Sequence, residues 1–134
     1  MFDSIATFLE LVRTLLGLSG QLKSAATERR QRMADLFDKI SECLADVSAK
    51  IRNGTPPHGR CGELATYAYQ LPGHIDAELG EEQAKEIGAI LLSAHNVEAV
   101  GIELLKSKDK EPELSIIDEA SGKFRALAHL LRAT

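Results

Sequence analysis

The chain has 134 residues, the length of a single domain with one hydrophobic core, and a net charge of −4 at pH 7. An acidic chain in which aromatic residues make up 4% offers neither the positive field nor the stacking platform of a nucleic-acid-binding protein. Its two cysteines are too few for a disulfide framework, so we expect reduced thiols and a cytoplasmic location. No apolar window is long enough for a membrane span, and no basic segment typical of a signal peptide precedes the first apolar residues.

Residues 2–18 are predicted to form the first helix. Its apolar side chains cover an arc of about 200°, against about 100° for a helix on the surface of a bundle. The excess arc includes Leu11, Leu15 and Leu18, which are candidate interface residues because large apolar patches are rare on small monomers. Either the helix lies at the centre of its own bundle, or a second copy of the chain covers these leucines in a homodimer. A helix lying in a membrane surface is a further alternative, but its polar edge carries a single basic residue.

Residues 21–53 are predicted to form one long helix. Its apolar residues fall within an arc of about 120°, and neither proline nor glycine interrupts the run before Gly54. An Asn-Gly pair and a Pro-Pro pair then end the helix. Arg29 lies within the apolar stripe, whereas the charged residues around it are expected to be solvated. If Arg29 is buried it needs a partner, and otherwise its side chain extends to solvent at the edge of the stripe.

Three further helices are predicted, at residues 60–71, 80–105 and 113–132. The first of them ends before Pro72, and Pro112 opens the last. Glu98 is the lone charge on the main apolar face of its helix, so we predict that Glu98 and Arg29 form a buried ion pair. No segment shows the alternation of a β-strand, and the loops suit antiparallel neighbours. The predicted fold is all-α: an antiparallel helical bundle of four main helices plus one short helix, in a single domain of residues 1–134.

His58 and Cys61 form the best candidate pair for catalysis, and the signal is weak. They are one helical turn apart beside Arg60, near a predicted helix start, where the pKa of a thiol is lowered. The same His-x-x-Cys spacing, with His74 downstream, lacks the second pair of ligands of a zinc site. Cys43 lies on an apolar face and is expected to be an inert buried thiol. Motifs for phosphate loops, dinucleotides, nucleophile elbows and zinc proteases are absent, so we expect no metal, no cofactor and no enzymatic activity.

In helix order and length, the chain is similar to N-terminal helical-bundle modules of signalling and cell-death proteins, which pair an apolar first helix with a long second helix. The predicted function is a non-catalytic cytoplasmic interaction module that binds a protein partner or a second copy of itself. Because the sequence stops directly after its last helix, it also suits the N-terminal part of a larger signalling or conflict-type protein. The alternatives are a membrane-active bundle that exposes the first helix to lipid, and an enzyme that uses Cys61 and His58.

Overall fold

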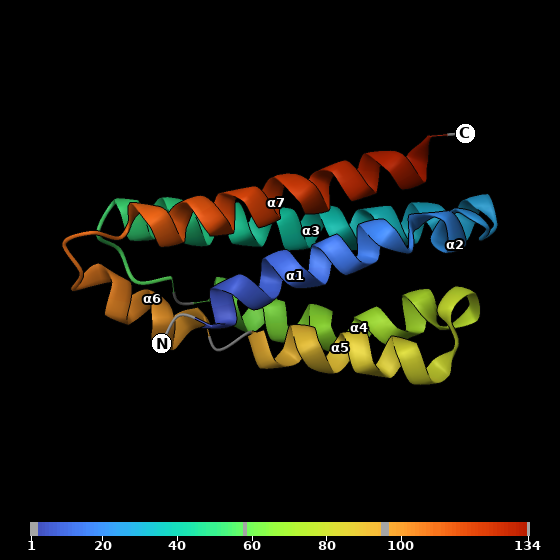
Figure 1. Ribbon diagram of the computed structural model, residues 1–134, viewed down its shortest axis with the longest axis horizontal. Coiled ribbons are helices and arrows are strands. Elements are labelled where there is room, and N and C mark those ends of the chain that lie inside the picture. The colour runs from blue at the N-terminus through green and yellow to red at the C-terminus, as the bar shows by residue number, and fades with distance from the viewer. Residues whose placement is uncertain (1–2, 58, 95–96, 134) are drawn as a thin grey trace.

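The computed structural model describes residues 3–57, 59–94 and 97–133, and within these ranges the chain forms seven helices and no strand (Figure 1). The predicted all-α fold class is therefore confirmed. The helices are α1 (Asp3–Gly17), α2 (Ser19–Lys23), α3 (Thr27–Arg52), α4 (Arg60–Leu79), α5 (Glu81–Ala94), α6 (Val97–Leu105) and α7 (Glu111–Arg132). Among the described residues, no helix is both long and apolar enough to cross a membrane.

The helices pack as two pairs with α1 between them (Figure 1). α3 and α7 lie side by side along most of their lengths, and α4 and α5 form a hairpin on the other side of α1. Because α1 contacts both α7 and α5, it is enclosed between the two pairs. α6 lies at one end of the molecule, where Gly101 approaches Ile51 in the last turn of α3.

The central position of α1 accounts for its wide apolar arc. Leu11 is 2% exposed and Leu15 is fully buried, while Leu18 is half-buried and packs against the core at the junction with α2. The chain's own helices therefore cover the face that was predicted as a candidate interface. The arc width indicated correctly that the second face is covered, but it does not distinguish a neighbouring helix of the same chain from a second molecule.

The long helix predicted at residues 21–53 is interrupted near its start. The chain is extended at Ala26, with ψ 152°, so that α2 and α3 are separate helices. The hydroxyl of Ser24 donates a hydrogen bond to the carbonyl of Gln21 at 2.5 Å, and such local bonds compete with continuation of a helix. At the other end α3 stops at Arg52, as the Asn-Gly pair predicts: Asn53 is the C-cap and Gly54, with φ +75°, follows it.

α4 continues through Pro72 to Leu79, past the predicted end of this helix. A proline inside a helix cannot donate to the carbonyl four residues earlier, here Ala68, and costs about 3 kcal/mol. Close packing against α5 offsets this cost: a Cβ at Gly88 would lie 2.6 Å from Cγ of Pro72 and 3.3 Å from the oxygen of Ala68. Only glycine allows this approach, and Gly80, with φ +90°, turns the chain between the two helices.

The helix lengths therefore differ from the predicted four main helices plus one short helix. The predicted short helix is the first part of α4, which has 20 residues. The segment predicted as one helix at residues 80–105 comprises α5 and α6, and residues 95–96 between them lie outside the described ranges. α7 has Pro112 in its first turn, as predicted, and begins at Glu111.

Polar contacts fix α3 against α7. Ser41 and Ser121 are buried where the two helices meet, and the hydroxyl of each donates a 2.8 Å hydrogen bond to the backbone carbonyl of the other. Near the end of α7, Arg132 binds Asp35 and Asp38 of α3, at 2.7 and 2.6 Å. These contacts set the position of α3, which also packs against α4.

Candidate functional site

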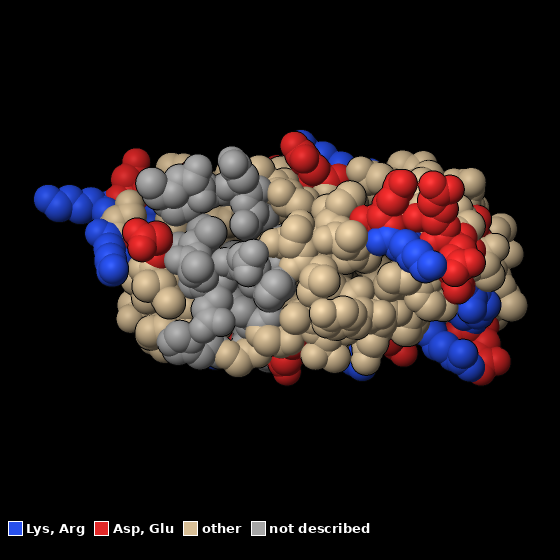
Figure 2. All heavy atoms as spheres, turned by 90° about the horizontal axis from the view of Figure 1, so that it is seen from below, with Lys and Arg blue, Asp and Glu red and all other residues tan. Residues whose placement is uncertain are grey.

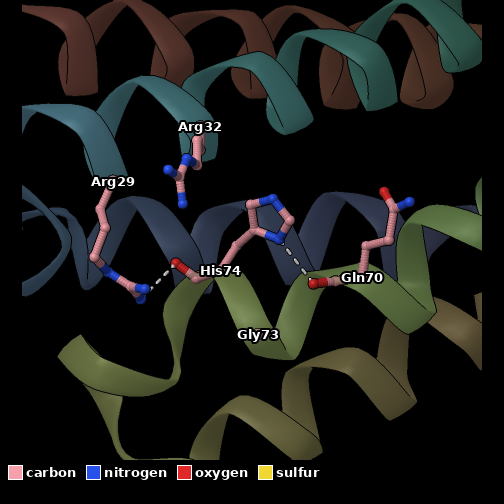
Figure 3. Close-up of a pocket in the computed structure, with 5 residues that line it drawn as sticks. All are labelled: Arg29, Arg32, Gln70, Gly73 and His74. Carbon is pink, nitrogen blue, oxygen red and sulfur yellow. Dashed lines mark hydrogen bonds between the residues drawn. The ribbon is translucent and has the colours of Figure 1, made fainter.

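A pocket of about 280 Å³ lies between α3 and α4 (Figure 3). α3 contributes Arg29 and Arg32 to its lining, and α4 contributes Gln70, Gly73 and His74. Figure 3 shows the side chains of Arg32 and His74 projecting from the two helices into the space between them. The lining residues of α4 lie on both sides of its proline, so the pocket exists because α4 continues past that proline.

A second hollow, of about 170 Å³, extends the pocket along α3 and shares three of its residues. It is lined by Arg32, Asp35, Leu36, Lys39, Gln70 and His74. The carboxylate of Asp35 is already bound by Arg132 of α7, at 2.7 Å. Leu36 is 3% exposed and contributes little surface, whereas Lys39 is exposed. The pocket and its extension are therefore lined mainly by basic and polar side chains.

An ion pair between Arg29 and Glu78 fixes one wall of the pocket. Nε and Nη2 of Arg29 donate to the two carboxylate oxygens of Glu78 at 2.9 and 2.8 Å, and Nη2 also donates to the His74 carbonyl at 3.2 Å. The side chain of Glu78 is 6% exposed, and a carboxylate oxygen of Asp76 lies 3.6 Å from the same Nη2. The hydrogen bond to Glu78 raises the pKa of Arg29. Arg29 therefore ties the start of α3 to the end of α4.

Glu98 was predicted as the partner of Arg29. The side chain of Glu98 lies outside the described residues, but its helix, α6, lies beside Ile51 in the last turn of α3, whereas Arg29 is in the first turn. The acid that binds Arg29 in this structure is Glu78. Glu78 was not predicted as the partner because the predicted helix ends before Pro72, and only a helix that continues past Pro72 places Glu78 at a defined angle.

A hydrogen bond holds the ring of His74 against its own helix. Nδ1 lies 2.8 Å from the carbonyl oxygen of Gln70, as Figure 3 shows. A carbonyl oxygen only accepts hydrogen bonds, so Nδ1 carries the proton. The ring of His74 therefore has a fixed position in the pocket lining.

The hairpin of α4 and α5 has an exposed surface without charged residues. No Asp, Glu, Lys or Arg occurs from residue 64 to 75 or from 87 to 97. Figure 2 shows the resulting broad area without charge on this face, beside the charged end of the hairpin. Tyr69 is 74% exposed and Ile90 is 41% exposed. We define the α4·α5 surface as the exposed residues Thr66, Tyr69, Ala89, Ile90 and Ser93.

The candidate reactive residues Cys61 and His58 lie outside the residues whose side chains are described. Cys43 is buried in α3, as expected for a thiol on an apolar face, and its Sγ lies 3.5 Å from a carboxylate oxygen of Glu63. Within the described part of the chain, no group of three or more His, Cys, Asp or Glu side chains is placed to hold a metal ion.

The pocket was not predicted because its residues belong to two segments that the sequence analysis treated separately. Arg32 is one of the charged residues near Arg29 that were expected to be solvated, and His74 lies beyond the predicted end of its helix. The available signal is spacing: Gln70, Gly73 and His74 share one face only if the helix continues through Pro72. Comparison of the chain with known protein families, with curated proteins and with solved structures gives no match.

Proposed function

We propose that the chain is a non-catalytic helical-bundle interaction module that associates with a second copy of itself through the α4·α5 surface. The observation that carries this proposal is the exposure of Tyr69, 74%, and Ile90, 41%, within stretches that have no charged residue. Aromatic residues are enriched at protein interfaces and charged residues are depleted in their cores. A surface of this composition is suited to burial against a partner.

The absence of charge favours a second copy as the partner. In a two-fold dimer the same patch meets itself, so every charged residue near the axis faces its own charge and repels it. The α4·α5 surface avoids this repulsion. Three acidic residues, Glu81, Glu82 and Glu86, lie toward the start of α5 and would oppose dimers in which the two hairpin ends meet.

α1 is not the surface that we propose for association. Leu11 and Leu15 are buried within the chain's own core, so exposing them to a partner or to lipid would require α1 to leave that core. The structure therefore gives no support to the membrane-active alternative.

Sedimentation equilibrium of three proteins tests the proposal. The wild-type chain is expected to dimerise at micromolar concentration, and a variant with Tyr69→Glu and Ile90→Glu is expected to be monomeric and folded. The matched control places the same two charges on exposed residues of α7, with Ala126→Glu and Leu130→Glu, and should remain dimeric. Circular dichroism establishes that the variants retain their helices.

Two outcomes would overturn this proposal. A wild-type chain that remains monomeric at high micromolar concentration would exclude self-association of this kind. Equal loss of dimer in the test variant and the α7 control would show that added negative charge, and not the α4·α5 surface, decides association.

A further inference from the structure

We propose that the pocket between α3 and α4 binds the carboxylate of a small organic acid, held by Arg32 and Lys39 with His74 beside it. The pocket and its extension share Arg32, Gln70 and His74, and measure about 280 and 170 Å³. Together they fall within the range of small-ligand sites, about 300–1,000 Å³. This inference is independent of self-association, because neither Arg32 nor Lys39 belongs to the α4·α5 surface.

Two of the three basic residues in the lining can exchange their contacts for a ligand. Arg29 keeps its contacts, because its Nε and Nη2 are bound to the buried carboxylate of Glu78 and to the His74 carbonyl. Arg32 pairs with Glu28 on its own helix, one turn earlier, with side chains 62% and 79% exposed. Exposed pairs of this spacing are weak and readily replaced. Lys39 makes no ion pair within the part of the chain that the structure describes.

The acidic residue of the lining, Asp35, has an ion-pair partner on α7. Asp35 is engaged by Arg132, at 2.7 Å, and Arg132 also binds Asp38, at 2.6 Å. The contacts of Asp35 are therefore directed toward α7. Arg32 and Lys39 remain as the groups that an incoming anion would meet, and a guanidinium suits the planar oxygens of a carboxylate.

The position of the pocket favours a carboxylate over a phosphate. Phosphate sites characteristically use the free backbone N–H groups at the start of a helix. Apart from Arg29 in the first turn of α3, whose guanidinium is bound by Glu78, the lining residues belong to the interiors of α3 and α4, where backbone N–H groups are engaged within the helices. Its donors are therefore side chains. The side-chain amide of Gln70, which belongs to both linings, offers a further donor beside the two basic groups.

The test is an NMR titration of the amide groups with succinate, and separately with inorganic phosphate, at constant ionic strength. Succinate should produce saturable shifts at Gln70, Gly73 and His74. A variant with Arg32→Gln and Lys39→Gln should bind succinate about tenfold more weakly or worse, because two charge-assisted contacts are removed. The matched control, Lys123→Gln with Arg125→Gln, removes the same charge from α7 and should bind like the wild-type chain.

Three results would overturn the proposal. Succinate shifts that do not saturate, or that are spread over the surface, would show non-specific attraction only. Phosphate that binds at these residues as tightly as succinate would refute the preference for a carboxylate. Equal weakening in the α7 control would show that net charge, and not this pocket, governs binding.

Discussion

Breaking the ion pair between Arg29 and Glu78 should destabilise the fold, because it leaves a carboxylate in the interior without its donors. The side chain of Glu78 is 6% exposed and accepts two hydrogen bonds from Arg29, whose own side chain is 33% exposed. Loss of one member costs about 3–5 kcal/mol for a buried pair, and at most about 1 kcal/mol for a surface pair. This pair has one buried and one partly exposed member, so we expect Arg29→Met to cost about 2–3 kcal/mol.

The measurement is a double-mutant cycle of Arg29→Met and Glu78→Gln, with urea unfolding followed by circular dichroism. The double variant should be more stable than the sum of the single losses predicts, by about 1–2 kcal/mol, because it leaves no unpaired buried charge. Arg32→Met is the matched control: its exposed pair with Glu28 should contribute within about 0.5 kcal/mol. Additive losses in the cycle, or a control as costly as Arg29→Met, would refute the reasoning.

Two further predictions concern helix packing and pH. Gly88→Ala should lower the free energy of unfolding by about 1–2 kcal/mol, because the added Cβ would lie 2.6 Å from Cγ of Pro72. Gly122→Ala, where no atom lies within 4 Å, should raise it by about 0.5–1 kcal/mol in the same unfolding assay. The hydrogen bond from Arg52 lowers the pKa of Glu111, so their pair should stabilise the fold at neutral pH and lose this effect as the pH falls through that lowered value. An NMR titration of Arg52→Gln should show the Glu111 pKa rising toward its ordinary value, and an unchanged pKa would contradict this cause.

The parts of the fold that follow from local chemistry could be predicted from the sequence. Apolar periodicity identified the helical segments, and with them the all-α class. The left-handed residue Gly54 follows the C-cap of α3, and Pro112 occupies the first turn of α7, as expected from the conformations that glycine and proline allow. Each of these predictions depends on residues within one or two turns of the feature.

The candidate pocket could not be predicted, because it depends on a contact between distant segments. Pro72 alone indicates the end of a helix, and only the close approach of Gly88, 16 residues later, makes continuation of α4 possible. Continuation then brings His74 and Glu78 onto the side of α4 that faces α3. Because the predicted helix ends before Pro72, neither the partner of Arg29 nor the part of the pocket that α4 lines could be predicted.

The choice of association surface also depends on which helix faces the folded chain covers, and a local sequence pattern does not show this. An apolar arc shows that a helix face must be covered, and in α1 the chain's own helices cover it, with Leu11 2% exposed and Leu15 fully buried. An exposed stretch without charge is different, because neighbouring helices have left it uncovered. Tyr69 keeps 74% of its surface exposed although α5 packs directly against its helix. Exposure that remains after folding is therefore the stronger argument for a partner, and it places the proposed interface on α4 and α5 instead of α1.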